Sequence, residues 1–95
     1  FDKRIKTSEL NNFLTAAIDA YSVPQKNNNP VRLNYMTQTR VRPPTFVIWA
    51  NSPDGVPVSY KRYLENRLRD TYGFDGTPLR IQVRQKRRPG EEKPR

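Results

Sequence analysis

The chain has 95 residues, with 18 Lys and Arg against 9 Asp and Glu, a formal net charge of +9, and neither His nor Cys. The missing His and Cys exclude zinc fingers, disulfides and histidine-dependent catalysis, and the length predicts a single domain. Such a surplus of positive charge favours a polyanionic partner, chiefly nucleic acid. No apolar run approaches the ~18 residues of a membrane span, so no membrane partner is expected. The first residue is Phe1 and no signal peptide follows it, so we expect a piece of a longer protein.

An amphipathic helix is predicted near the N-terminus, capped by Thr7 or Ser8 and continuing to about Tyr21. Its apolar residues recur at intervals that place them on one stripe of a helix. The stripe consists of Leu10, Phe13, Leu14, Ala17, Ile18 and Tyr21. Pro24 ends the helix, and the polar segment 25–30 is predicted to be a loop.

Two strands are predicted next, joined by the corner 39–44, whose Pro43 and Pro44 cannot donate ladder hydrogen bonds. Segment 31–38 alternates as a half-buried strand does, whereas segment 45–51 is apolar on both faces. We expect the core-facing side chains to be Leu33, Tyr35, Thr37, Phe46, Ile48 and Ala50. The opposite face is then expected to carry Arg32, Asn34, Met36, Gln38, Val47 and Trp49.

A second helix and a third strand complete the pattern. Ser59 is expected to cap a helix that ends near Tyr72, where Gly73 fits the left-handed position after a helix. The apolar ridge of this helix is Tyr60, Leu64, Leu68 and Tyr72. Segment 79–84 alternates with Arg80, Gln82 and Arg84 outward. Residues 85–95 contain no apolar side chain and are expected to form a basic, disordered tail after a domain covering residues 5–84.

The predicted order, helix-strand-strand-helix-strand, indicates an α+β fold. The first two strands should form an antiparallel hairpin, and a right-handed crossover makes the third strand parallel to the second. If the third strand lies beside the second, the doubly apolar strand is central in a three-stranded mixed sheet. Both helices are then needed to cover one face, so the other face is left open.

Two stretches of the sequence resemble a known family. The stretches LNYMTQTRVRPPTFVIWANSP and SYKRYLENRLRDTYGFDGTPLRI closely resemble the C-terminal domain of the bacterial tandem GTPases called Der or EngA, over roughly residues 5–84. The resemblance implies a KH-like fold of reduced type II. It also implies a cytoplasmic role in maturing the large ribosomal subunit, with rRNA or that subunit as partner, and docking on the GTPase domains of the same chain. GTP and Mg²⁺ are expected in those absent domains.

The chain departs from ordinary KH domains at the loop that grips nucleotides. A KH domain clamps four nucleotides with a Gly-X-X-Gly loop, but the equivalent segment, 51–58, has only Gly55. Sequence-specific reading in the KH manner is therefore not expected. No glycine-rich phosphate loop with Lys-Ser/Thr is present either. We expect no cofactor, metal or catalytic residue in this piece, which should be a monomeric binding module and not an enzyme.

Basic residues near this loop, in the corner and in the tail are the candidates for RNA contact. They are Arg40, Arg42, Lys61, Arg62, Arg69, Lys86, Arg87 and Arg88. On the second helix, a solvated face and a phosphate-tracking face are equally compatible with the pattern. Arg67 falls within the apolar arc, so we expect it to pack on Tyr63 for structural reasons.

The open face has an apolar centre, which usually marks a contact surface. Trp49 could stack a base, anchor a neighbouring domain, or be covered by a terminal tail. A stacking platform usually has more than one exposed aromatic residue, so we favour docking on the GTPase domains. The docking candidates are Met36, Val47, Trp49, Arg80 and Gln82. The alternative function is a purely structural docking module that makes no contact with RNA.

Overall fold

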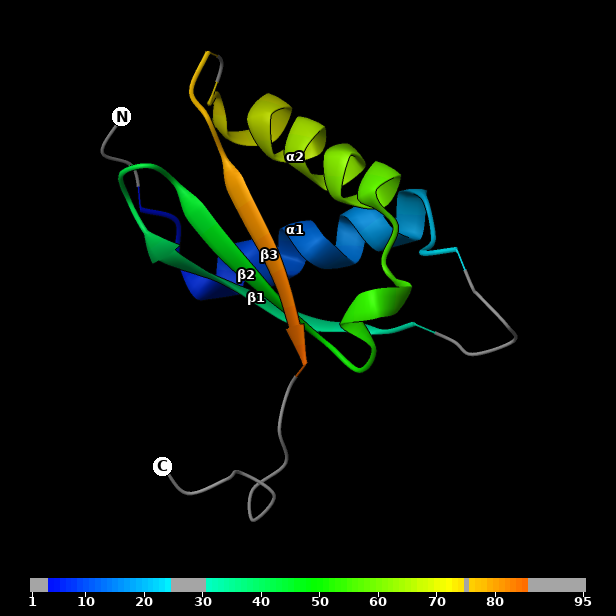
Figure 1. The fold of residues 1–95 in the computed structure, drawn as a ribbon. Coiled ribbons are helices and arrows are strands. Elements are labelled where there is room, and N and C mark those ends of the chain that lie inside the picture. The colour runs from blue at the N-terminus through cyan, green and yellow to red at the C-terminus, as the bar shows by residue number, and fades with distance from the viewer. Residues whose placement is uncertain (1–3, 25–30, 75, 86–95) are drawn as a thin grey trace, which may run out of the picture.

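The computed structural model describes residues 4–24, 31–74 and 76–85 (Figure 1). Its elements are α1 (Thr7–Ala20), β1 (Leu33–Arg40), β2 (Thr45–Ala50), the 3-10 turn η1 (Pro53–Gly55), α2 (Val58–Tyr72) and β3 (Arg80–Gln85). The predicted element order and the α+β class are confirmed. No helix in the described part of the chain is long and apolar enough to cross a membrane.

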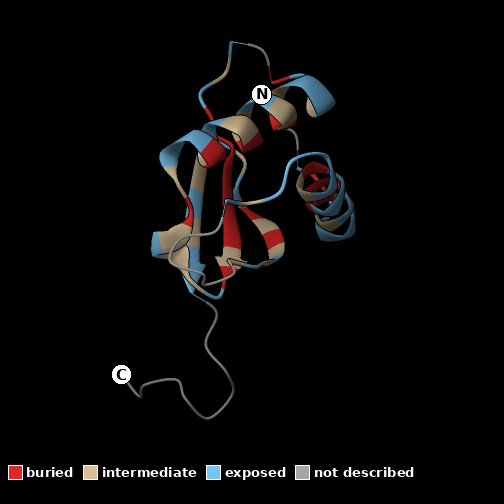
Figure 2. Ribbon diagram, turned by 90° about the vertical axis from the view of Figure 1, so that its right-hand side faces the viewer, coloured by how far each residue is buried: buried red, intermediate tan, exposed pale blue. Residues whose placement is uncertain are grey.

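The sheet has the order β1-β2-β3, with β2 antiparallel to β1 and parallel to β3. Figure 2 shows β2 buried along almost its whole length between strands of mixed exposure. The central position of the doubly apolar strand is therefore confirmed. The corner between β1 and β2 contains a cis peptide bond between Arg42 and Pro43.

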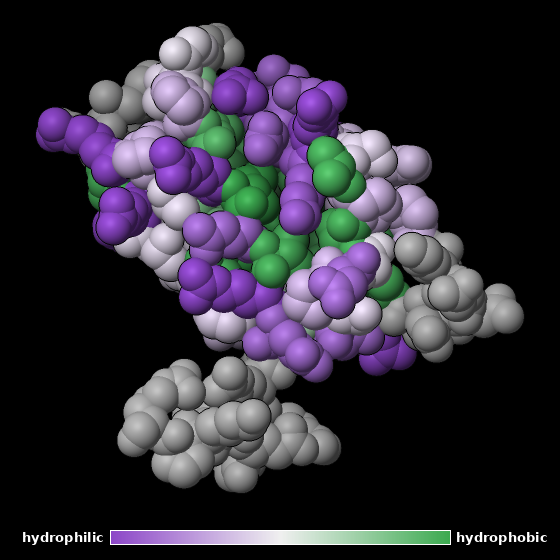
Figure 3. Space-filling model, in the orientation of Figure 1, coloured by the Kyte–Doolittle hydropathy of each residue, from purple (hydrophilic) through white to green (hydrophobic). Residues whose placement is uncertain are grey.

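The hydrophobic core lies between both helices and one face of the sheet. Fully buried side chains from each layer meet there, including Leu10 of α1, Phe46 and Ile48 of β2, and Leu64 and Leu68 of α2. Each large apolar side chain buried in this way contributes about 1.5–3 kcal/mol. In the view of Figure 3, hydrophobic residues form a narrow band surrounded by hydrophilic ones. The core is thus incompletely covered at its margin, where Ile81 and Val83 of the edge strand β3 are half-buried.

A bulge in β1 reverses the predicted faces of most of that strand. Leu33 pairs with Ala50 but Tyr35 pairs with Trp49, so β1 advances by two residues while β2 advances by one. Because one extra residue turns every later side chain to the other face, Met36 and Gln38 face the core. Met36 has no exposed surface, and its predicted place on the open face is wrong.

Gln38 is a polar side chain in the core, but its amide is paired. The side-chain Oε1 accepts a hydrogen bond of 2.8 Å from the backbone N–H of Ile5, and Nε2 donates to the carbonyl of Arg40 at 3.0 Å. Buried polar groups are tolerated when they are paired in this way. The contact also holds the segment before α1 against the end of β1.

The predicted helix caps are wrong, whereas the predicted helix end is confirmed. The N-cap positions belong to Lys6 and Pro57, and neither supplies a side-chain hydrogen bond. Gly73 adopts the left-handed conformation, with φ 74°, and its N–H donates to the carbonyl of Arg69 at 2.8 Å. A glycine is favoured there because other residues are strained at positive φ.

Candidate nucleic-acid interface

The face of the sheet that the helices do not cover carries a shallow hollow of ≈ 530 Å³. It is lined by Thr39, Arg40, Pro43, Thr45, Val47, Trp49, Arg80, Gln82 and Arg84. All three strands and the corner between β1 and β2 contribute to this lining, which we call the open-face hollow. It brings together the RNA candidate Arg40 and the docking candidates Val47, Trp49, Arg80 and Gln82.

Strand pairing fixes the positions around the hollow. Val47 lies between Thr37 of β1 and Gln82 of β3, and it is only 3% exposed. Trp49 is half-buried and stacks on Tyr35, with ring centroids 6.1 Å apart. The predicted apolar centre therefore shrinks to one aromatic pair, because Met36 is in the core and Val47 has almost no accessible surface.

The rim of the hollow is cationic. Arg40, Arg80 and Arg84 are exposed, and β1, β2 and β3 contain no Asp or Glu at all. Arg84 donates a hydrogen bond of 2.8 Å from Nη2 to Oε1 of Gln82, which orients its guanidinium group along the strand. The positive potential of the rim is therefore not cancelled by any side chain of the sheet.

Trp49 supplies an unusual polar group in this hollow. Its indole nitrogen, Nε1, is buried and has no hydrogen-bond partner among the described residues. Most buried donors in native proteins are paired. Because the Nε1 atom has almost no accessible surface, it is not presented to a ligand on the open face.

The loop between β2 and α2 is not built as a phosphate clamp. Val58 stands where a Gly-X-X-Gly pattern starting at Gly55 would need its second glycine. A Cβ atom at Gly55 would lie 2.7 Å from Cγ2 of Val31. Gly55 is therefore required for close packing within the fold. The loop is also tied to the sheet, since the backbone N–H of Arg32 donates to Oδ1 of Asn51 at 2.8 Å.

The basic residues of α2 differ in what they do. Lys61 is half-buried and Arg62 is exposed. Arg69 donates from Nη2 to the carbonyl of Thr77 at 3.2 Å and so links α2 to the turn before β3. The guanidinium carbon of Arg67 lies 5.8 Å from the centre of the Tyr63 ring, which confirms the predicted packing. Of these four residues, Arg62 is the one exposed cation.

The remaining RNA candidates lie in two places. Arg42 is exposed in the corner between β1 and β2. Lys86, Arg87 and Arg88 lie outside the described residues. Both sites stay predictions from the sequence.

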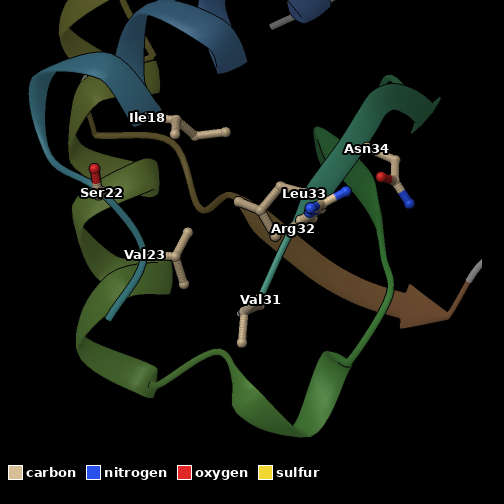
Figure 4. Close-up of a pocket in the computed structure, with 7 residues that line it drawn as sticks. All are labelled: Ile18, Ser22, Val23, Val31, Arg32, Leu33 and Asn34. Carbon is tan, nitrogen blue, oxygen red and sulfur yellow. The ribbon is translucent and has the colours of Figure 1, made fainter. Parts of the chain in front are cut away.

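A second hollow, of ≈ 430 Å³, lies between the end of α1 and the start of β1 (Figure 4). Ile18, Val23 and Leu33 point into it, and Arg32 is the one charged residue in its lining. A local sequence pattern does not reveal this hollow, because its walls come from segments on both sides of residues 25–30. It has no cationic cluster and is not a candidate for nucleic acid.

A cluster of tyrosines joins the two helices. The hydroxyl of Tyr63 donates to the carbonyl of Ala17 at 2.7 Å, and that of Tyr60 donates to the carbonyl of Tyr21 at 2.6 Å. These bonds satisfy carbonyl groups at the end of α1. Burial, together with the neighbouring Tyr63 and Tyr21, raises the pKa of Tyr60 to about 12. The cluster is structural, and the described residues contain no group of metal-ligating side chains.

The sequence is similar to that of a family of KH-like domains and to that of several proteins. The family model described as the KH-domain-like, C-terminal part of EngA bacterial GTPase enzymes matches residues 4–84. Similar proteins called GTPase Der occur in Trichlorobacter lovleyi, with 44% identity over 93% of this chain, and in Natranaerobius thermophilus, with 45% over 90%. The protein of that name from Thermomicrobium roseum is 48% identical over 90% of this chain.

The chain spans only about a fifth of the length of these relatives, since the matched part is 20%, 20% and 19% of each. The match to the family model, by contrast, runs from before α1 to Arg84 in β3. The chain therefore belongs to the family of KH-domain-like C-terminal domains of the EngA GTPases.

Proposed function

We propose that this domain contacts rRNA during maturation of the large ribosomal subunit, in the cytoplasm, and docks on the GTPase domains of its own protein. The relatives are named as GTPases. In the proposal, GTP and Mg²⁺ bind in the parts of the protein that this chain does not include. The domain itself binds rRNA and the GTPase domains, and it carries out no catalysis.

The observation that carries the proposal is the open-face hollow. Its three exposed arginines stand on a sheet without acidic residues. Arginine binds phosphate through a planar, bidentate guanidinium group. Each phosphate that a protein neutralises releases counterions, which makes RNA binding strongly dependent on salt.

The missing second glycine sets the kind of binding that we propose. Since Gly55 packs against Val31, the loop lacks the open backbone that a KH domain uses to hold nucleotides. Contacts to phosphates position an RNA strand but do not read its bases. We therefore propose affinity for RNA with little sequence preference.

Binding of the chain to large-subunit rRNA tests this part of the proposal. The chain is titrated with that rRNA and with an unrelated RNA of equal length at several salt concentrations. We expect similar affinities for both and a steep loss of affinity as salt rises. Absence of binding at low salt would support the alternative, a module that only docks.

Docking on the GTPase domains is the second part of the proposal. Trp49 and Tyr35 are the aromatic residues available on the open face, and the half-buried Ile81 and Val83 offer apolar surface at the edge of β3. An anchoring aromatic residue at an interface contributes ~2 kcal/mol or more. We expect Trp49→Ala to leave the chain folded and to weaken its association with separately produced GTPase domains. An unchanged affinity would exclude Trp49 as an anchor.

A further inference from the structure

We propose that the open-face hollow, and not the loop between β2 and α2, is where a single-stranded RNA segment binds. Its phosphates would contact Arg40, Arg80 and Arg84, and one base would lie against Trp49. The inference rests on the proposed contact with RNA, and it specifies the surface and the side chains through which RNA would bind.

The charge of the hollow selects an anionic occupant. The described strands carry arginines and no acidic residue, so an anion approaching the sheet meets no carboxylate on the strands themselves. The apolar part is small, because Val47 is 3% exposed and Met36 is fully buried. RNA would use the three arginines of this face, whereas the GTPase domains would use its aromatic pair, so the two partners would compete for Trp49.

The spread of the arginines suits a polymer of phosphates. Arg80 and Arg84 are four residues apart on one strand, which separates their Cα atoms by about 13 Å. Arg40 and Arg80 both pair with Thr45, from opposite sides of β2, so their Cα atoms are about 10 Å apart. Arginine side chains are long enough to converge on one phosphate over such distances, and they can also contact consecutive phosphates of one strand. A titration with inorganic phosphate separates these two occupants.

Trp49 provides the part of the site that a base would use. Stacking of a base on an aromatic side chain contributes about 1–3 kcal/mol and tolerates any base. The indole ring is half-buried and held by Tyr35, so it is already fixed in place.

The chain offers a direct reporter, since Trp49 is its one tryptophan. The intact chain is titrated at low salt with a single-stranded oligouridylate while tryptophan fluorescence is recorded. Arg84→Glu is compared with Lys6→Glu, which makes the same change of charge at the exposed N-cap position of α1. We expect RNA to change the fluorescence of Trp49. Arg84→Glu should raise Kd roughly tenfold or more, and Lys6→Glu less than about threefold. Circular dichroism should show both variants folded.

Several results would overturn the inference. If Lys6→Glu weakens binding as much as Arg84→Glu, RNA does not bind specifically at the open-face hollow, although the proposed function stands. If the intact chain binds no RNA, the proposed contact with RNA fails as well. If inorganic phosphate alone produces the same fluorescence change, the hollow is a general anion site. If an oligoglutamate peptide binds with the same dependence on Arg84, the occupant is an acidic protein segment.

Discussion

Trp49 stacks on Tyr35 across the boundary between β2 and β1, with ring centroids 6.1 Å apart and ring planes inclined by 30°. The pair exists because the β1 bulge turns Tyr35 away from the core. Without the register shift after Leu33, Met36 would pair with Val47 on the open face, and the apolar surface there would be larger. The bulge thus converts an apolar face into one with a single aromatic pair and a cationic rim.

The reversal of faces predicts a stability difference between neighbouring residues. Met36→Ala removes a side chain with no exposed surface and is expected to lower the free energy of unfolding by about 2–5 kcal/mol. Thr37→Ala, on the half-buried open side, should lower it by less than about 1 kcal/mol. Urea unfolding of both variants measures these free energies. A larger loss for Thr37→Ala than for Met36→Ala would show that Thr37 faces the core and that β1 has no bulge before it.

Close packing of the β2–α2 loop predicts a specific coupling. Gly55→Ala places a Cβ atom 2.7 Å from Cγ2 of Val31, and such overpacking is expected to lower the free energy of unfolding by about 1–3 kcal/mol. Because Val31→Ala removes the clashing methyl group, the double variant should be more stable than the sum of the two single effects predicts. A double-mutant cycle by urea unfolding gives the coupling energy, and strict additivity would contradict this packing.

The tyrosine cluster predicts a loss of stability at high pH. The pKa of Tyr60 is raised to about 12, above the ordinary value of about 10. The folded state therefore holds this proton more tightly than the unfolded state. The resulting stabilisation is complete below about pH 10 and is lost as the pH rises towards 12.

A matched variant isolates this effect. Tyr60→Phe loses the hydrogen bond to Tyr21 and should be less stable at neutral pH. Between pH 10 and 12, the free energy of unfolding should fall in both proteins. The fall should be roughly 2 kcal/mol smaller for Tyr60→Phe than for the unaltered chain. The raised pKa of Tyr72, caused by burial and by Glu9, acts in both proteins and cancels in the difference. If the free energy of unfolding falls equally in both proteins over this pH range, Tyr60 has the same pKa in the folded and unfolded states.

The basic C-terminal segment predicts a change in salt dependence. Removing residues 86–95 deletes five cations, Lys86, Arg87, Arg88, Lys93 and Arg95, along with Glu91 and Glu92. If the three consecutive cations contact phosphates, the slope of log Kobs against log salt for rRNA should flatten by roughly one unit or more. An unchanged slope would show that this segment does not contact RNA.

The elements of the fold could be predicted because each carries a strong local pattern. The apolar stripe of α1 and the alternation of β3 follow from side-chain geometry alone. The bulge at β1 leaves no such trace, since Tyr35 and Met36 are both compatible with either face. The buried place of Gln38 depends on a hydrogen bond from Ile5, and a contact between residues so distant in the chain is not visible in a local pattern.

The candidate site could be predicted in part for the same reason. Arg80 and Arg84 were expected on the open face because β3 alternates without interruption. The position of Arg40 on the rim depends on a second register shift, between Gln38 and Arg40. The near-complete burial of Val47 results from its neighbours on both sides, which only the assembled sheet brings together.

The salt dependence of rRNA binding, measured with a variant that removes the cationic rim, shows whether the open-face hollow holds phosphates. The variant carries Arg40→Gln, Arg80→Gln and Arg84→Gln, all at exposed positions, so it should remain folded. With a slope of about −0.7 per phosphate contact on single strands, we expect the slope for the variant to be flatter by about two units. A slope equal to that of the unaltered chain would show that the open-face hollow holds no phosphate.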